Sequence, residues 1–317
     1  MTGSVIKITD IRAKRPKPGL GRQHLTCVEA AAKISTGRVH GNQLGSDWLR
    51  FEPGTILPGE YRFDVGTAGS CTLVLQTILP ALMLADQPSR ITLKGGTHNP
   101  MAPPFDFLER TFAPALARMG PQLTLQLVRP GYFPKGQGKM IVDIHPVSRL
   151  QPLELIERGT IAEKRARAYV TKLSHTIADR EFDVVHKRLD WPYRNMKVVP
   201  DRTGLHSGNV LFLEIESEGL TEVFTGFGLK NVRAEDVAKR VCGHAENYLK
   251  QDGPVGAYLA DQLLIPFALA GSGAFRTVEP SDHTTSNMQV IEKFLPVTFE
   301  HKEVPKGKAW EIRVNAK

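Results

Sequence analysis

The chain has 317 residues, 41% of them hydrophobic and 23% charged, a composition typical of a globular protein and not of a disordered one. Its formal net charge of +8 at pH 7 favours polyanionic partners. No apolar run reaches the roughly 20 residues of a membrane span, and the first residues lack a stretch like a signal peptide, so we expect a cytoplasmic protein. Three scattered cysteines indicate neither a metal site nor a disulfide framework.

The first notable segment is a basic stretch, residues 12–24, that leads into a helix starting near Gly21. Its Pro and Gly residues exclude a continuous helix, so we expect an extended chain with projecting cationic side chains. Arginines beside a helix N-terminus suit a phosphate, because guanidinium groups bind it bidentately and the helix end is positive. A solvated basic loop is the alternative interpretation.

An internal repeat organises much of the remaining chain. Its first copy begins with an apolar helix over residues 69–82 and continues with a strand over residues 90–94. A polar turn ending at Asn99 and a second helix, residues 105–119, complete it. A partial further copy begins at Gly21.

The second copy repeats this order near the end of the chain. It has an apolar helix over residues 256–269, a strand over 274–278, a turn over 281–283 and a helix over 287–294. Each apolar helix also contains a proline at a matching place. Helix, strand, turn and helix, repeated, predict an α/β fold in which sheets pack against buried helices.

The segment between the copies differs in character. A charged helical pattern over residues 163–176 is followed by a loop with Pro and Arg, an alternating strand over 209–216 and a helix over 234–249. The predicted domains are a repeat-built domain, residues 1–156 and 251–317, and a smaller inserted domain, residues 157–250.

Two places in the second copy could carry chemistry. Asp261 and Gln262 lie in an apolar helix, where polar groups need a partner or a ligand, although a carboxylate there could simply interact with the helix dipole. His283 lies in a polar turn, and an imidazole with one free ring nitrogen is a nucleophile. An inert loop histidine is the alternative, and His98 in the first copy meets the same criteria.

Two glycine-rich turns occur in the first half of the chain, residues 94–97 and 131–138. Neither has the spacing of a P-loop or of a dinucleotide-binding fingerprint. We interpret both as turns between strands.

Taken together, these segments resemble the RNA 3'-terminal phosphate cyclase family over nearly the whole chain, from about Ile8 onward. The strongest matches are residues 12–24, 66–76, 95–97, 102–104, 258–262 and 280–283.

The resemblance implies an α/β (α+β) fold in which repeated βαβαββ-type units form a large domain, with a smaller inserted α/β domain. It also implies ATP-dependent conversion of an RNA 3'-terminal phosphate to a 2',3'-cyclic phosphodiester. His283 occupies the place of the family's adenylated nucleophile, whereas His98 falls where the family has none. By the same resemblance, Arg12, Arg15, Arg22, Gln23 and His24 bind phosphates of ATP or RNA, Pro103, Phe107 and Tyr258 lie near the adenine, and Asp261 and Gln262 contact the nucleotide.

The resemblance further implies ATP and a divalent cation, Mg²⁺ or Mn²⁺, as cofactors. The implied partner is an RNA with a 3'-phosphate end. No association with a membrane is expected, and the chain could form a homodimer. The family normally opens with a strand, a Glu-Gly-Gly-Gly-Gln turn with the metal-binding carboxylate, and a helix, which do not occur in this sequence. We therefore expect an open strand edge in the first repeat, and a helix over residues 69–82 less covered than its copy over 256–269. Pro130 and Gln137 also depart from the family's glycine-rich signature.

Two rival functions follow from related proteins. A non-catalytic cyclase-like protein would bind RNA in ribosome assembly and would lack the histidine and the nucleotide-pocket residues. An enolpyruvyl transferase has similar repeats but binds small anions and is not labelled by ATP. The presence of His283, Tyr258, Asp261 and Gln262 favours the enzyme.

Overall fold

The computed structural model describes residues 2–201, 203–305 and 308–317. It contains helices and four mixed or antiparallel sheets, so the predicted α/β (α+β) class is confirmed. The chain forms two compact units, the first running to Pro103 and including Pro121–Arg149, the second comprising Pro104–Gly120 and Leu150–Lys317. Within the described residues, no helix combines the length and the apolar character needed to cross a membrane.

The first unit contains a small antiparallel sheet and a four-stranded mixed sheet. The small sheet has the order β1-β3-β2, and the larger one the order β4-β5-β7-β6. Strand β4 runs parallel to β5, and the other pairs of the larger sheet are antiparallel. The elements of this unit are β1 (Ile6–Ile8), α1 (Arg22–Ile34), β2 (Arg38–His40), β3 (Leu49–Glu52), β4 (Glu60–Asp64), α2 (Cys71–Leu82), β5 (Ser89–Gly95), β6 (Gln122–Arg129) and β7 (Gly138–His145).

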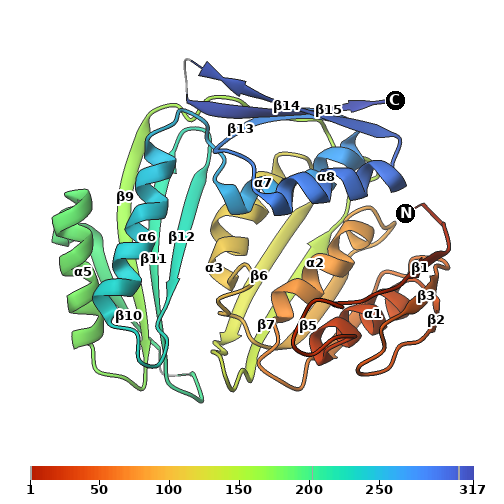
Figure 1. Ribbon diagram of the computed structural model, residues 1–317, viewed down its shortest axis with the longest axis horizontal. Coiled ribbons are helices and arrows are strands. Elements are labelled where there is room, and N and C mark those ends of the chain that lie inside the picture. Colours follow the sequence, from red (N-terminus) through yellow and green to blue (C-terminus); the bar gives the residue numbers. More distant parts are fainter. Residues whose placement is uncertain (1, 202, 306–307) are drawn as a thin grey trace. The chain divides into compact units, whose positions relative to one another are not determined.

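The second unit contains a sheet with the same topology. Its order is β14-β15-β13-β8, with β13 parallel to β8 and antiparallel to β15, as β5 is parallel to β4 and antiparallel to β7. Helices α7 and α8 lie along one face of this sheet (Figure 1). The predicted internal repeat is therefore present in the strand order. Its elements are β8 (Leu153–Leu155), α7 (Ala257–Ala270), β13 (Ser272–Thr277), α8 (Asp282–Phe294), β14 (Val297–Val304) and β15 (Ala309–Ala316).

The helix expected over residues 105–119 is interrupted by a π-helical turn. Its parts are α3 (Phe105–Phe107), η1 (Leu108–Phe112) and α4 (Ala113–Ala117). Such turns inside α-helices are frequent at functional sites.

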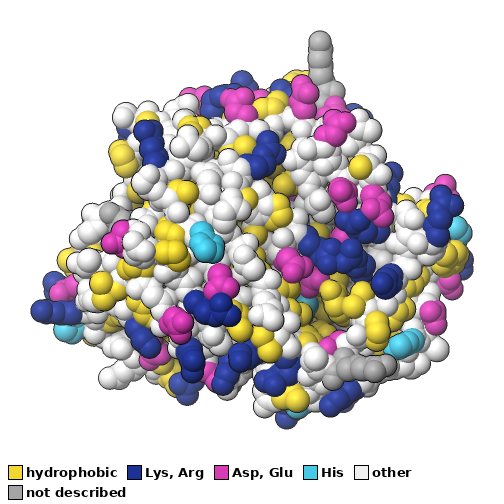
Figure 2. Space-filling view, turned by 180° about the vertical axis from the view of Figure 1, so that it is seen from behind, with side chains coloured by type: hydrophobic (Ala, Val, Ile, Leu, Met, Phe, Trp, Pro, Cys, Tyr) yellow, Lys and Arg dark blue, Asp and Glu magenta, His cyan; other side chains and the backbone are white. Residues whose placement is uncertain are grey.

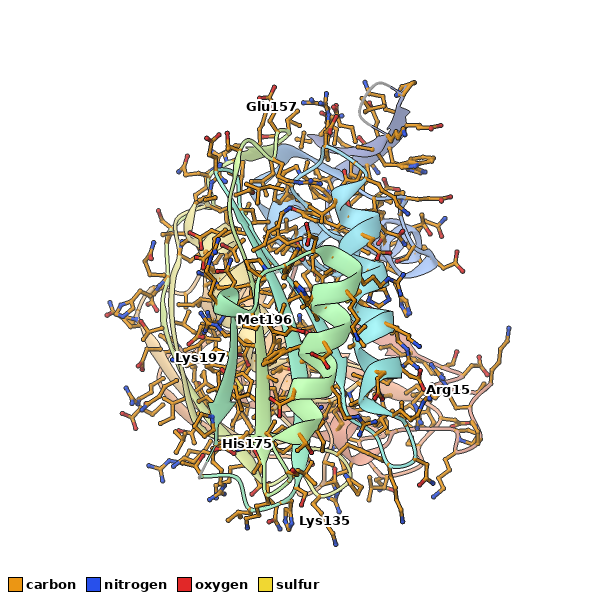
Figure 3. The ribbon with its side chains drawn as sticks, turned by 90° about the vertical axis from the view of Figure 1, so that its left-hand side faces the viewer. Arg15, Lys135, Glu157, His175, Met196 and Lys197 are labelled. Atoms are coloured by element: carbon orange, nitrogen blue, oxygen red, sulfur yellow. The ribbon has the colours of Figure 1, made fainter. Side chains whose placement is uncertain are left out.

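A further sheet, of order β10-β9-β11-β12, belongs to the second unit and lies in the chain between β8 and α7. Helices α5 and α6 lie side by side on one face of it (Figures 1 and 3). Their contact buries a core that includes Phe182, Leu213 and Tyr248. The division at residues 157–250 stays a prediction. The elements are β9 (Ile161–Thr171), α5 (Thr176–Leu189), η2 (Tyr193–Asn195), β10 (Met196–Pro200), β11 (Gly208–Ser217), β12 (Thr221–Phe227) and α6 (Ala234–Leu249).

One predicted element in this region is wrong. The charged helix expected over residues 163–176 is strand β9, and the helix follows it as α5. Ala166, Ala168 and Val170 alternate with more exposed residues and are buried in the core. Pairing with β11 fixes this alternation and overrides the helix propensity of Ala, Glu, Lys and Arg. The strand at 209–216 and the helix at 234–249 are confirmed.

The expectation that the first apolar helix is less covered than its copy is also wrong. Helix α2 buries residues along its whole length from Cys71 to Leu82, as α7 does from Leu259 to Ala270. Strand β4 does form a sheet edge, but β8 forms the equivalent edge in the second copy. An open edge is thus common to both repeats.

Candidate functional site

The second unit brings three predicted residues together at the start of α7. Tyr258, Asp261 and Gln262 are spaced i, i+3 and i+4, so they share one face of the helix. The Tyr258 side chain is 61% exposed, and its ring lies edge-on to that of His244, with 6.4 Å between centroids. Asp261 and Gln262 are half-buried. This face thus presents an accessible aromatic ring next to a carboxylate and an amide.

His283 lies on the first turn of α8 and not in a turn before the helix, as the sequence had suggested. Ser281 is the N-cap, and its side chain accepts a hydrogen bond from the Thr284 backbone N–H at 3.3 Å. The cap starts the helix five residues earlier than predicted. His283 is exposed, and it lies at the positive end of the helix, where a phosphate is stabilised.

A hydrogen bond joins the two helices beside these residues. The Asn287 side chain donates to Asp261 Oδ1 at 2.9 Å. Since His283 and Asn287 are four residues apart, they share a face of α8, and that face meets the Tyr258–Asp261 face of α7. The sequence predicted no role for Asn287, although its i+4 spacing from His283 was an available signal.

The N-terminus of α7 is held by a fully buried carboxylate. Glu222 Oε2 accepts a hydrogen bond from the Gly256 backbone N–H at 2.9 Å, and Gly256 is the N-cap of the helix. Burial raises the pKa of Glu222 to about 8, while the Gly256 and Val223 N–H groups and Arg158 oppose the shift. Glu222 therefore binds the N-cap of α7, two residues before Tyr258, a role that no pattern in the sequence had indicated.

The first unit contains the basic segment, which is not extended as predicted. The Ala13 N–H donates to Asp10 O and the Arg15 N–H to Arg12 O, so the chain forms tight turns. Asp10 and Arg12 both have left-handed backbone conformations, with φ of 56° and 55°. Gly19 is also left-handed, and a side chain there would collide with Gly45.

These turns place Arg12 beside the N-terminus of α1. Arg12 Nη1 donates to Gly19 O at 2.9 Å, and the Gly21 N–H donates to His24 Nδ1 at 3.2 Å. Burial, and secondarily the Arg12 charge, lower the pKa of His24. Neutral His24 therefore carries its proton on Nε2, which remains a donor.

Gln23 completes this group. Its Oε1 accepts a hydrogen bond from the Ser70 backbone N–H at 2.5 Å, so the side-chain NH₂ group is oriented by that contact. Arg15 and Arg22 are exposed. The structure thus gathers Arg12, Gln23 and His24 at one helix N-terminus, with two further arginines on the same segment.

Gln76 is a polar residue that the sequence analysis did not assign. It lies on α2, and its Nε2 is buried with no hydrogen-bond partner among the described residues. A buried donor without a partner is unfavourable, so a ligand acceptor would stabilise it. An amide on an otherwise apolar helix was the signal in the sequence.

Three other residues that the sequence suggested, His98, Pro103 and Phe107, are buried or half-buried. His98 is 2% exposed, and its ring lies 5.6 Å from that of Tyr132, as expected for a packed structural side chain. Pro103 is half-buried, and its carbonyl accepts from Thr72 Oγ1 at 2.7 Å. Phe107 is buried. The proximity of Pro103 and Phe107 to an adenine stays a prediction.

Comparison with known proteins identifies the family to which this sequence is similar. The sequence model of the family described as "RNA 3'-terminal phosphate cyclase" matches residues 1–301. The chain belongs to the RNA 3'-terminal phosphate cyclase family. Among its relatives, the RNA 3'-terminal phosphate cyclase of Pseudomonas fluorescens is 50% identical over 95% of this chain and 87% of that protein. Those of Ectopseudomonas mendocina and Koribacter versatilis are 48% and 46% identical, over 94% and 96% of this chain and 87% and 85% of theirs.

The family resemblance inferred from the sequence is therefore confirmed, while the role of each site residue stays a prediction. The cyclase-family chain provides no preformed metal centre among its described residues, since no three His, Cys, Asp or Glu side chains are placed to hold an ion. Mg²⁺ commonly needs only one or two carboxylates in addition to substrate phosphates and water. A divalent cation that arrives with the nucleotide therefore stays a prediction.

The buried Glu222 leads to a prediction about stability. Because its folded pKa is raised above the unfolded value, its contribution is complete below about pH 4.5 and is lost as the pH rises through about 8. Glu222→Gln keeps an acceptor for Gly256 and cannot ionise. Between about pH 5 and pH 9, we expect the wild-type free energy of unfolding to fall relative to the variant by on the order of 3 kcal/mol.

Urea unfolding at several pH values measures this difference. Glu303→Gln, at an exposed position, is the matched control and should keep the wild-type pH dependence. Parallel curves for the wild type and Glu222→Gln would contradict the prediction.

Proposed function

We propose that this protein converts an RNA 3'-terminal phosphate to a 2',3'-cyclic phosphodiester, with ATP as the energy source and His283 as the adenylated nucleophile. The observation that carries the proposal is the exposed His283 at the positive end of α8, beside the Tyr258–Asp261 face of α7 and joined to it through Asn287. Membership of the RNA 3'-terminal phosphate cyclase family supports it.

The first step is nucleophilic substitution at phosphorus. An unprotonated ring nitrogen of His283 attacks the α-phosphorus of ATP, a P–N bond forms, and the bond to pyrophosphate breaks. The exposed position lets the imidazole reach a bound nucleotide, and the α8 N-terminus stabilises negative charge on the phosphoryl oxygens. Tyr258 supplies an accessible ring for the base, and Asp261 and Gln262 supply polar contacts.

Two further transfers complete the reaction. An oxygen of the RNA terminal phosphate attacks the same phosphorus and takes AMP from His283, which breaks the P–N bond. The neighbouring ribose 2'-OH then attacks the RNA phosphate, loses its proton and expels AMP. Proximity favours this step, because the hydroxyl is already held beside the phosphate. In the proposal, Arg12, Gln23 and His24 bind the phosphates and neutralise developing charge.

The decisive test uses ATP labelled at the α-phosphate. A phosphoramidate at His283 predicts label on the protein that is stable to base and labile to acid. We expect such label in the wild type and its discharge on addition of RNA with a 3'-phosphate, with formation of a cyclic end. Absence of label together with RNA binding would favour the non-catalytic RNA-binding function.

A further inference from the structure

Three loops of the first unit meet at one edge of the sheet β4-β5-β7-β6. Residues 65–70 follow β4, residues 96–103 follow β5, and residues 130–137 connect β6 to β7. Since β4 and β5 are parallel and β6 and β7 form an antiparallel hairpin, all three loops emerge at the same end. The third of them is the glycine-rich turn to which the proposed reaction gives no role.

Backbone hydrogen bonds fix the three loops against one another. The Gly96 N–H donates to Gly69 O at 2.8 Å, and the Thr97 N–H donates to Gly131 O at 3.0 Å. These contacts make the glycine-rich turn part of a continuous surface with the other two loops.

The glycine-rich turn is also anchored by its own residues. Gly136 has φ of +67°, and a Cβ there would lie 2.6 Å from Ala68 Cα, so the turn sits directly on the first loop. Tyr132 is 4% exposed and packs against His98. The turn is therefore held in place from both sides.

The next side chains in this anchored turn point outward. Phe133 is 62% exposed, directly after the buried Tyr132. Lys135 is exposed and lies at the periphery of the protein in Figure 3. Exposure of a large apolar ring to water is unfavourable on its own. An exposed aromatic ring beside a cationic side chain is an arrangement on which proteins stack the bases of single-stranded nucleic acid.

The first loop connects this turn to the phosphate-binding group. Ser70 donates to Gln23 at one end of the loop, and Gly136 contacts Ala68 two residues earlier. None of the three loops contains an Asp or a Glu. Basic and acidic side chains are interleaved over the face shown in Figure 2. The loop surface therefore combines cationic charge, an aromatic ring and continuity with Arg12 and His24.

We propose that Phe133 and Lys135 bind a nucleotide upstream of the RNA 3' end, with the ring stacked on a base and the ammonium group on the backbone. The inference rests on the proposed function, and it assigns the strand's direction, from the terminal phosphate at Gln23 across residues 65–70 to Phe133. Aromatic stacking tolerates any base. The site thus selects single-stranded RNA of sufficient length and not a particular sequence.

Direct binding tests the proposal without ATP. The probe is a fluorescent single-stranded RNA of about 12 nucleotides with a 3'-phosphate, followed by anisotropy. Phe133→Ala should weaken binding by about 5- to 100-fold, and Phe133→Trp should bind as the wild type does, because stacking is restored. Phe294→Ala removes a ring that is 44% exposed on another surface and should change nothing. A nucleoside 3'-phosphate should bind equally to all variants.

Lys135→Gln tests the proposed contact between the ammonium group and the RNA backbone independently. It should lower the slope of log affinity against log salt by about 0.7, the value for one contact to a single strand. Equal RNA affinity of Phe133→Ala and the wild type would overturn the proposal. It would also be overturned if Phe133→Ala changed the oligomeric state and left the RNA affinity unchanged, because Phe133 would then belong to a protein interface. If Phe133-dependent binding is present but the wild type never acquires AMP label, the catalytic proposal fails and the RNA site stands.

Discussion

His283→Ala is expected to reduce covalent AMP on the protein to background while the fold survives. The imidazole is the attacking group in the proposed reaction, and alanine offers no nucleophile in its place. His283 is exposed on the first turn of α8, and its neighbour Thr284 keeps the cap bond to Ser281. Truncation therefore creates no cavity. Acid-labile label from α-labelled ATP, together with a thermal melt, measures both parts of this expectation.

His98→Ala is the matched control for this prediction. His98 is 2% exposed and packs on Tyr132, so its removal should lower the melting temperature through lost packing. The folded fraction should still acquire AMP at the wild-type level. Wild-type label in His283→Ala would exclude it as nucleophile, and complete loss in folded His98→Ala would reverse the assignment of the two histidines.

The repeated helices could be predicted because their apolar residues cover nearly the whole circumference, which marks a buried helix. The strand order could not be read from the sequence, which predicted only that helix, strand, turn and helix recur in both copies. Strand β9 was missed because Ala166 and Ala168 are small and have high helix propensity, so that only pairing with β11 reveals the alternation. Such long-range pairing leaves no local signal.

Parts of the candidate site that depend on long-range packing could not be predicted from the sequence either. Residues alone did not distinguish His283 from His98. The structure separates the two by exposure, and only the family resemblance had favoured His283. The bond between Asn287 and Asp261 joins two helices and depends on their packing. Glu222 was missed because a carboxylate in a strand normally faces solvent, whereas here it holds the Gly256 N–H.

Arg12→Ala and Arg15→Ala are each expected to slow use of ATP or of the RNA phosphate by about 10- to 1000-fold, the range for loss of a charged contact in the transition state. The structure distinguishes the two arginines. Arg12 is held by Gly19 O and lowers the pKa of His24, whereas Arg15 is exposed. Lys7→Ala is the control, since Lys7 lies over the Trp48 ring outside this group.

The effect of Arg12 on His24 gives this prediction a pH signature. Without the guanidinium charge, the pKa of His24 rises toward its ordinary value, because one cause of its lowering is removed. The acid limb of the rate profile of Arg12→Ala should therefore move to higher pH if neutral His24 is the active form, and Arg15→Ala should leave it in place. Measuring AMP labelling and RNA cyclisation separately shows which phosphate each arginine binds. Small, equal effects of Arg12→Ala, Arg15→Ala and Lys7→Ala would instead mean that this segment is a solvated basic loop. In a phosphate site, loss of a guanidinium group weakens binding of the anion.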